Sequence, residues 1–406
     1  MSTIKYFVFL SAFFLACASG QTPEKKTTTT QAADTVKEPP IQVGAERLDL
    51  YLPLLKDKRV GLVANQTATI HQTHLADVLL RKGVGLTRIF SPEHGFRGKA
   101  DAGAKVKGGK DPVTGLPVIS LYGKNKKPKA EQLQGLDVVV FDIQDVGARF
   151  YTYISTLHYV MEACAENHIP VVILDRPNPN GYYVDGPVLN PKFKSFIGMH
   201  PIPIVHGMTI GEYGKMINGE AWLKGGIQAD LTVIPCAHYN HRMAYSLPIK
   251  PSPNLPNDRS ILLYPSLCLF EGTVISVGRG TDKQFQIFGH PDLPEGDFVF
   301  TPKPMPGARH PKLEGKTCKG FNLSELSLDK IRQPKQLNLT YLLRAYALFP
   351  DKKNFFLKNH FFDKLAGSDV LRKQIEQGLT EKEIRNSWAG GLTKFKKIRQ
   401  KYLLYK

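Results

Sequence analysis

Short apolar runs alternate with longer amphipathic stretches from about Arg59 onward. Uninterrupted runs of β-branched and aromatic residues are typical of strands buried on both faces of a sheet. The pattern predicts strands at 60–64, 86–90, 117–122, 136–143, 170–174 and 230–234. It predicts helices between them at 73–82, 148–167 and 209–217. Strands separated by helices indicate an α/β fold, a Rossmann-like domain with a mostly parallel sheet covered by helices on both faces.

The pattern changes near Pro251. Ser252-Pro-Asn-Leu-Pro-Asn257 is a cluster of turn-forming residues and predicts a domain boundary. Beyond it we expect strands at 273–277 and 285–288, helices at 339–348 and 370–377, and two further helices within 379–406, separated by Gly390-Gly391. The predicted organisation is a Rossmann-like catalytic domain at 42–251 followed by a smaller α+β auxiliary domain at 252–406.

The N-terminal segment has a different character. Lys5 precedes an almost unbroken apolar run over 6–16, which predicts a secretory signal peptide at 1–20. Cys17 stands where a bacterial lipoprotein signal places its cysteine, and ordinary cleavage beside the neighbouring small residues is the alternative. Residues 21–41 are rich in Thr, Gln, Lys and Pro, which predicts a disordered tether. We expect an exported protein, in the periplasm or lipid-anchored to the cell envelope through Cys17.

Composition narrows the class of protein. A chain of 406 residues that is 42% hydrophobic and 22% charged is typical of a globular protein of about two domains. The net charge of +18 suits nucleic acid, an anionic surface or an acidic substrate. Because no nucleic-acid-binding signature accompanies it and export argues against a genomic target, we expect no nucleic-acid partner. The cysteines beyond Cys17 lack CxxC spacing, so we expect most to be buried apolar side chains and no zinc site.

Four polar loops follow four of the expected strands. Ligands bind beyond the carboxyl ends of parallel strands, so side chains in these loops are candidates for one shared site. The loops carry Asn65 after the first strand, residues 91–98 after the second, residues 142–149 after the long apolar strand, and residues 175–181 after the next.

Glu93 lies in the loop Ser91-Pro-Glu-His-Gly-Phe-Arg-Gly98. It is either an ordinary turn carboxylate or a positioned general acid whose proton affinity is raised by burial or a second carboxylate. His94 is either an acid/base group or a hydrogen-bond partner, and we favour the second. Asp142 and Asp145 are candidates for the second carboxylate, and we expect one of them to be structural, because Asp-x-x-Asp before a helix also serves as a cap.

Other polar residues have two interpretations each. Arg97, Arg149 and Arg176 could clamp a substrate carboxylate or pair with the aspartates. Asn178 and Asn180 could bind a ligand or form turns. In the second half, Glu271 is a candidate carboxylate contributed across the domain interface, and Arg279 stands between two glycines that allow close backbone approach. Neither GxxxxGK[ST] nor GxGxxG is present, which argues against a nucleotide cofactor.

Several of these segments resemble the exo-β-N-acetylmuramidases of the NamZ type, which are peptidoglycan-recycling glycoside hydrolases. The similar segments are 60–67, 91–98, 142–153, 175–181, 252–257, 271–281 and 402–405. They occur in order and extend the resemblance from about residue 42 to the end of the chain.

The resemblance implies a Rossmann-like domain and a smaller C-terminal domain with the active cleft between them. It implies release of N-acetylmuramic acid from the non-reducing ends of peptidoglycan fragments, without a cofactor or metal. Glu93 matches the catalytic glutamate, and its partner is left open among Asp142, Asp145, Asp185 and Glu271. Glycoside hydrolysis normally uses two carboxyl groups, and the lactyl carboxylate of muramic acid gives a pocket arginine a role. The expected substrate-binding residues are Asn65, His94, Arg97, Arg149, Tyr153, Arg176, Asn178, Asn180, His206, Asn254 and Arg279.

Two other functions stay open. One is a metal-dependent cell-wall hydrolase using His94, His206 and an aspartate, although no HExxH motif is present. The other is a surface lipoprotein that binds saccharide without turnover. Activity that survives a strong chelator excludes the first, and measurable release of muramic acid excludes the second.

Overall fold

The computed structural model describes residues 39–93, 95–97 and 109–405, together with Val8, Leu10 and Ala12. Pro40–Lys406 forms one compact unit. The expected signal peptide apart from Val8, Leu10 and Ala12, the expected tether up to residue 38, and His94 lie outside the described residues. The predictions made for the signal peptide, Cys17, the tether and His94 therefore stay predictions.

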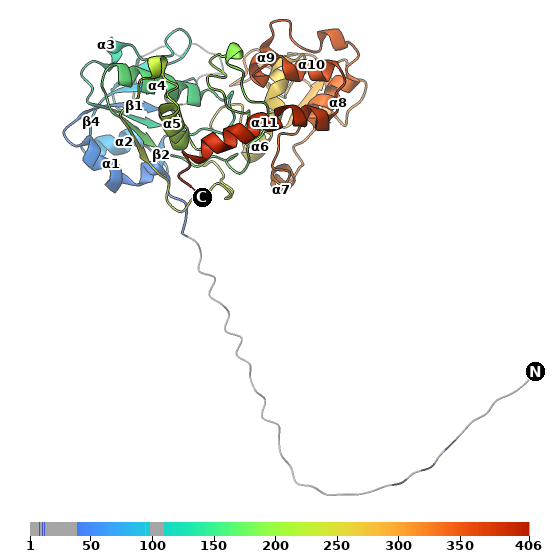
Figure 1. Ribbon diagram of the computed structural model, residues 1–406, viewed down its shortest axis with the longest axis horizontal. Helices are drawn as coiled ribbons and strands as arrows, with labels where there is room; N and C mark the ends of the chain where they lie inside the picture. The colour runs from blue at the N-terminus through green and yellow to red at the C-terminus, as the bar shows by residue number, and fades with distance from the viewer. Residues whose placement is uncertain are drawn as a thin grey trace, which may run out of the picture. The chain divides into compact units, whose positions relative to one another are not determined.

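The described helices and strands alternate through the first half of the chain and give way to a helix-rich second half (Figure 1). The helices are α1 (Leu48–Leu55), α2 (Leu75–Arg81), α3 (Ala130–Leu133), α4 (Tyr153–Glu166), α5 (Ile210–Gly219), α6 (Asp258–Leu267), α7 (Leu328–Arg332), α8 (Thr340–Leu348), α9 (Phe361–Ala366), α10 (Val370–Glu376) and α11 (Glu381–Gln400). The strands are β1 (Arg59–Ala64), β2 (Thr69–Ile70), β3 (Thr73–His74), β4 (Gly85–Ser91), β5 (Gly109–Lys110), β6 (Pro117–Ser120), β7 (Val138–Asp142), β8 (Val171–Leu174), β9 (Leu231–Ile234), β10 (Ile287–His290), β11 (Phe298–Phe300) and β12 (Cys318–Asn322).

The main sheet of the described chain has the strand order β5-β6-β4-β1-β7-β8-β9. All its pairings are parallel except that of β5 with β6. A smaller antiparallel sheet, β10-β12-β11, follows with helices α6 to α11. The expected fold class, a Rossmann-like α/β domain followed by a smaller α+β part, is confirmed. The boundary expected at residue 251 stays a prediction.

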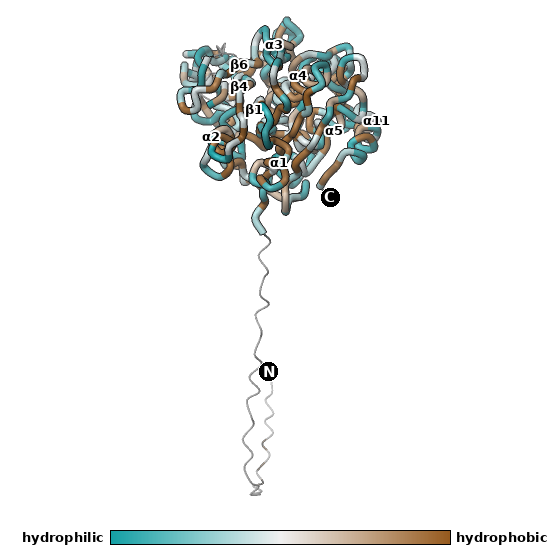
Figure 2. Tube along the Cα trace, turned by 90° about the vertical axis from the view of Figure 1, so that its left-hand side faces the viewer, coloured by the Kyte–Doolittle hydropathy of each residue, from teal (hydrophilic) through white to brown (hydrophobic). Residues whose placement is uncertain are grey.

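Alternating side chains of β7 pack on opposite faces of this sheet, as a strand covered on both sides requires. Val138 and Val140 share a core with residues of α1 and α2. Val139 and Phe141 belong to a second core that contains residues of α4 and α5 and continues into the C-terminal half. Helices therefore cover both faces of the sheet, and hydrophobic stretches run through the interior of the compact unit (Figure 2).

Strand register brings the expected loops to one edge. Ala64 pairs with Asp142, Val63 with Phe90, and Phe141 with Ile173, so β1, β4, β7 and β8 end at similar heights. The loops that follow these strands therefore meet at the carboxyl edge of the sheet, where they can contribute to one site.

The helix expected over 148–167 begins later than predicted. Only Tyr153–Glu166 is helical, and the preceding residues form a loop whose Arg149 N–H bonds to the Ile204 carbonyl. Phe150 and Tyr151 are nevertheless buried, because tertiary contacts cover them without a helix.

The expected strand at 273–277 is also absent from the structure. The segment makes only isolated bridges, Thr273 with Phe356 and Ser276 with Gly289. A half-buried lysine bonds to carbonyls of this segment instead of a strand partner: the Lys312 ammonium lies 2.5 Å from the Thr273 carbonyl and 3.2 Å from that of Ile275. The expected strand at 285–288 lies slightly later, as β10.

The two helices expected within 379–406 are one helix, α11, which runs through Gly390-Gly391. Cys164, Cys236, Cys268 and Cys318 are free and buried, as predicted. Among the described residues no helix combines the length and apolar character needed to cross a membrane.

Candidate active site

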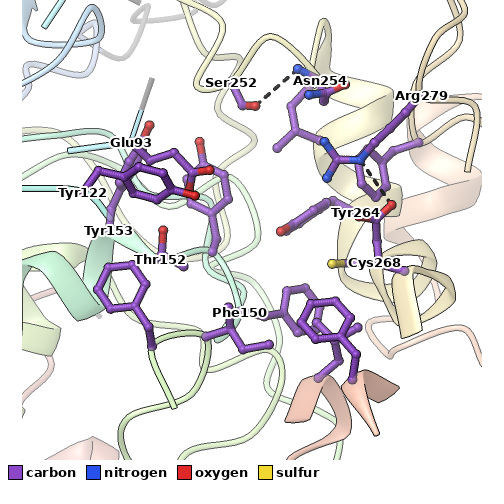
Figure 3. A pocket seen from close by; sticks show the side chains of 18 residues that line it. Glu93, Tyr122, Phe150, Thr152, Tyr153, Ser252, Asn254, Tyr264, Cys268 and Arg279 are labelled. Atoms are coloured by element: carbon purple, nitrogen blue, oxygen red, sulfur yellow. Dashed lines mark hydrogen bonds and ion pairs between the residues drawn. The ribbon is translucent and has the colours of Figure 1, made fainter. Parts of the chain in front are cut away.

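A cavity of about 250 Å³ lies where the carboxyl-edge loops face the second half of the chain. Its first wall comes from Glu93, Tyr122, the 150–153 loop and Phe196-Ile197, and its second from residues that follow Pro251. Figure 3 shows Glu93, Tyr122 and Tyr153 on one side, with Asn254, Tyr264 and Arg279 facing them. The described lining is Glu93, Tyr122, Phe150, Tyr151, Thr152, Tyr153, Phe196, Ile197, Ser252, Asn254, Leu255, Tyr264, Cys268, Glu271, Arg279, Phe285, Phe361 and Leu365.

Glu93 follows β4 in a turn that the local sequence specifies. The Gly95 N–H bonds to the Pro92 carbonyl at 3.1 Å, and Gly95 has a φ of 79°, a conformation that favours glycine. Arg97 anchors the other end of the turn through Asp111, with nitrogen–oxygen distances of 2.7 and 2.8 Å. Glu93 therefore lies at the cavity wall in a turn that the Gly95–Pro92 hydrogen bond closes.

Tyr122 contacts Glu93 directly. Its hydroxyl is hydrogen-bonded to the Glu93 side chain, and burial together with the Glu93 charge raises the pKa of Tyr122 to about 12. The hydroxyl consequently stays protonated at ordinary pH and can donate to the carboxylate. Tyr122 is not among the residues expected from sequence, although it ends a predicted strand at the same sheet edge as the four polar loops.

Aromatic side chains form much of the cavity wall. Tyr151 and Tyr153 pack edge to face with ring centroids 4.8 Å apart, and Tyr264 lies 5.9 Å from Tyr151. The hydroxyls of Tyr151 and Tyr153 donate to the Pro251 carbonyl at 2.8 and 3.3 Å. These bonds join the 150–153 loop to the segment that begins the second half, and both tyrosines line the cavity.

Glu271 and Arg279 enter the cavity from the second half. Arg279 Nε lies 3.1 Å from Glu271 Oε1, and the guanidinium lies 5.1 Å from the centroid of the Phe285 ring. Glu271 is in a short 3₁₀ helix, Cys268–Gly272, whose Phe270 carbonyl lies 3.1 Å from the Lys312 ammonium. The cavity thus holds a second carboxylate and a cation side by side.

The boundary motif also contributes to the cavity. Asn254 Nδ2 donates to the Gly307 carbonyl at 2.9 Å, and its backbone N–H donates to Ser252 Oγ at 3.2 Å. Asn257 caps α6 by accepting from the Ser260 N–H. The turn cluster at 252–257 therefore starts a helix and supplies part of the site.

Of the residues expected from sequence, Glu93, Tyr153, Asn254, Glu271 and Arg279 line this cavity. Asp142 is fully buried and forms a two-bond ion pair with Arg176, whose Nη2 lies 2.8 Å from Asp142 Oδ2. Arg176 also donates to the Thr69 carbonyl. This pair fixes neighbouring loops under the sheet edge, and neither member reaches the cavity lining.

Asp145 and His206 lie together in the interior. Asp145 Oδ2 accepts the Gly147 N–H at 2.7 Å and lies 4.0 Å from His206 Nε2. Burial raises the pKa of Asp145 to about 7 and lowers that of His206 to about 3. Both side chains are buried, and neither belongs to the described cavity lining.

Arg149 and Asp185 join distant parts of the chain. Arg149 is fully buried and donates to the carbonyls of Pro187, Ile202 and Leu365. Asp185 accepts from the Leu337 N–H and from Arg385, each at 2.8 Å.

The remaining candidates hold turns at the sheet edge. Asn65 Oδ1 accepts from the N–H and hydroxyl of Thr67. Asn178 donates to the Met208 carbonyl, and Asn180 donates to the carbonyls of Val146 and Ile261. Within the described residues, no group of three or more His, Cys, Asp and Glu side chains is arranged to hold a metal ion.

Comparisons with known proteins agree on one family. Residues 60–259 match the family model described as "Exo-beta-N-acetylmuramidase NamZ, N-terminal", and residues 262–405 match its C-terminal counterpart. The peptidoglycan beta-N-acetylmuramidase NamZ of Bacillus subtilis is 40% identical over 423 aligned positions, which cover 98% of this chain and 99% of that protein.

Two crystal structures of DUF1343 family proteins from Bacteroides fragilis have the same fold. The first has a TM-score of 0.84 and 47% identity, and the match covers 91% of this chain and 99% of that one. The second has a TM-score of 0.76 and 31% identity, with 91% and 100% covered.

Proposed function

The chain belongs to the NamZ family of exo-β-N-acetylmuramidases, and from this we propose that Glu93 is the catalytic acid with which it releases N-acetylmuramic acid from peptidoglycan fragments. Membership makes the protein a glycoside hydrolase that acts on peptidoglycan. The further proposal is that cleavage occurs at the non-reducing end and that the chemistry takes place in the cavity between Glu93 and Glu271.

The observation that carries the proposal is the pairing of two carboxyl groups with an arginine in one aromatic-walled cavity. Of the four candidates for a second carboxylate, Glu271 is the one in the described lining that holds Glu93. Aromatic faces suit the apolar face of a sugar ring, and a volume of about 250 Å³ suits a single amino sugar better than a long glycan. A small, partly closed cavity favours exo cleavage.

Glu93 would give its proton to the glycosidic oxygen as the bond to the anomeric carbon breaks. Glu271, which contacts Arg279, would stabilise the positive charge that develops on the sugar. It would then either take a proton from the attacking water as base or attack the anomeric carbon as nucleophile, with water releasing the sugar afterwards. The hydrogen bond from the Tyr122 hydroxyl would hold the Glu93 carboxyl in one orientation throughout the reaction.

Arg279 is the residue we propose for the lactyl carboxylate of the released sugar. Arg97, Arg149 and Arg176 are each engaged by protein acceptors outside the described lining, whereas Arg279 is part of it. Its contact with Glu271 would place the bound carboxylate close to the reacting centre. We also propose that the protein is exported and carries a lipid anchor at Cys17. The N-terminal sequence alone supports this part of the proposal.

The test is release of muramic acid from a chromogenic muramide. Glu93→Gln keeps the size of the side chain but removes its exchangeable acid proton. We expect kcat to fall by about 10²- to 10⁴-fold on the disaccharide of N-acetylmuramic acid and N-acetylglucosamine, whose leaving oxygen needs that proton, and by less on the chromogenic muramide. Glu131→Gln, on the exposed surface of α3, is the matched control and should retain full activity. Thermal unfolding of both variants checks that the fold is retained.

Other results would exclude the proposal. Full activity of Glu93→Gln would remove Glu93 from the chemistry, and loss of activity in a strong chelator would favour the metal-dependent alternative. Binding of the muramide by the wild type without any release would favour the saccharide-binding alternative.

A further inference from the structure

The loop 123–129 follows Tyr122 and contains Lys124, Lys126, Lys127 and Lys129. It joins the carboxyl end of β6 to α3. Because Tyr122 lines the cavity and touches Glu93, this lysine-rich loop begins at the edge of the candidate active site.

Two adjacent lysines of this loop have different surroundings. The Lys127 ammonium lies 2.7 Å from carboxylate oxygens of both Glu162 and Glu166, so its charge is balanced by the protein. The Lys126 ammonium lies 4.4 Å from the centroid of the Phe196 ring. No ion pair joins Lys126 to an acidic side chain in the part of the chain that the structure describes.

Phe196 connects Lys126 to the cavity. The ring is part of the cavity lining, whereas Lys126 itself is half-buried outside that lining. An ammonium over an aromatic face is oriented and partly desolvated but still carries its full charge. Lys194, exposed two residues before Phe196, adds a second positive charge to the same rim. A carboxylate is the group that this arrangement would bind most favourably.

We propose that Lys126 binds a carboxylate on the leaving-group side of the substrate. The inference rests on the proposed function, in which Arg279 serves the lactyl carboxylate of the sugar inside the cavity. Lys126 lies outside the lining, so it would meet the part of the substrate that projects from the cavity, which in exo cleavage is the leaving glycan. That carboxylate is either the lactyl group of the next muramoyl residue or a carboxyl group of a stem peptide.

The proposal predicts a substrate-dependent effect of Lys126→Met, which keeps the length of the side chain and removes the charge. We expect KM to rise about three- to fivefold for a tetrasaccharide with a second muramoyl residue, as for an exposed ion pair. KM should be unchanged for the chromogenic muramide and for the disaccharide of N-acetylmuramic acid and N-acetylglucosamine, because their leaving groups carry no carboxylate.

Two control variants and a comparison of substrates distinguish the possible outcomes. Lys129→Met, in the same loop and exposed, should leave every substrate unaffected, and Lys126→Arg should restore the tetrasaccharide KM. An effect on the peptide-free tetrasaccharide identifies the lactyl carboxylate, and an effect confined to peptide-bearing fragments identifies the stem peptide. An equal KM rise on the chromogenic muramide, or no rise on any substrate, would overturn the proposal. Failure of the proposed function is distinct, since the wild type would then release no muramic acid from any substrate.

Discussion

Asp145 and His206 are two ionisable side chains that the fold keeps neutral. Asp145 Oδ1 and His206 Nε2 are buried and have no hydrogen-bond partner among the described residues. Burial raises the pKa of Asp145 to about 7 and lowers that of His206 to about 3, so near pH 5 the aspartic acid is protonated and the imidazole is neutral. At that pH the interior therefore holds this pair without burying a charge.

This pair predicts a pH dependence of stability. In the unfolded chain Asp145 titrates near its ordinary pKa of 3.8, and in the folded protein near 7. Its stabilising protonation is therefore fully present below about pH 4 and is lost as pH rises through 7. Asp145→Asn removes this titration, so from pH 4 to 7.5 its free energy of unfolding should gain about 1–3 kcal/mol relative to the wild type. Urea unfolding of both proteins at several pH values measures the difference, and a difference independent of pH would contradict the assignment.

At this scale the sequence could identify which residue types stand at the sheet edge but not which of them face the cavity. Glu93, Glu271 and Arg279 were named from sequence and do line it. Asp142 and Arg176 were named for the same reasons, yet they form an ion pair with each other and do not belong to the described cavity lining. The choice between a ligand-binding group and an internal ion pair depends on side-chain direction, which local sequence does not determine.

Helix α11 shows that local sequence also fails to determine where a helix ends. Glycines in a helix interior are unfavourable, so Gly390-Gly391 predicted a break. The helix continues because a capping box from Thr380 and Glu383 fixes its start and Ile384, Trp388 and Phe395 are buried along one face. Tertiary packing therefore outweighs propensity here, and Gly391 allows close approach, since a Cβ there would lie 3.3 Å from Val188. The strands of the main sheet other than the short, exposed β5 were predictable because their apolar runs are continuous.

The two glycines of α11 should respond oppositely to substitution. A Cβ at Gly390 meets nothing within 4 Å, so Gly390→Ala should raise the free energy of unfolding by about 0.5–1 kcal/mol through helix propensity. Gly391→Val, the matched variant, should destabilise by about 1–3 kcal/mol, because its side chain would overlap with Val188. Denaturant midpoints measure both effects. Destabilisation by Gly390→Ala would instead support a break between two helices.

On the scale of the whole molecule, the C-terminal segment returns to the first half of the chain. The Tyr405 hydroxyl donates to Asp175 Oδ2 at 2.6 Å and accepts from the Cys236 N–H at 2.8 Å. The Leu404 N–H donates to Glu212 Oε1 at 2.8 Å. Asp175 directly follows β8, so the end of the chain is attached to the same sheet edge that positions the cavity. These contacts span most of the sequence and could not be predicted from any local pattern.

The attachment predicts that one hydroxyl near the chain end stabilises the whole compact unit. Tyr405→Phe keeps the ring but leaves the buried Cys236 N–H without its acceptor and removes one donor from Asp175. We expect a loss of about 1–3 kcal/mol in the free energy of unfolding, the usual cost of an unsatisfied buried polar group. Tyr402→Phe is the matched control: its hydroxyl bonds to Glu220 at 2.6 Å near the surface, where water can replace it, so the loss should stay below about 1 kcal/mol.

Because the cavity is built from both halves, Tyr405→Phe should lose muramidase activity at a lower temperature than the wild type while keeping its KM at 25 °C. Equal denaturant midpoints for the two variants would show that the C-terminal segment is not coupled to the sheet.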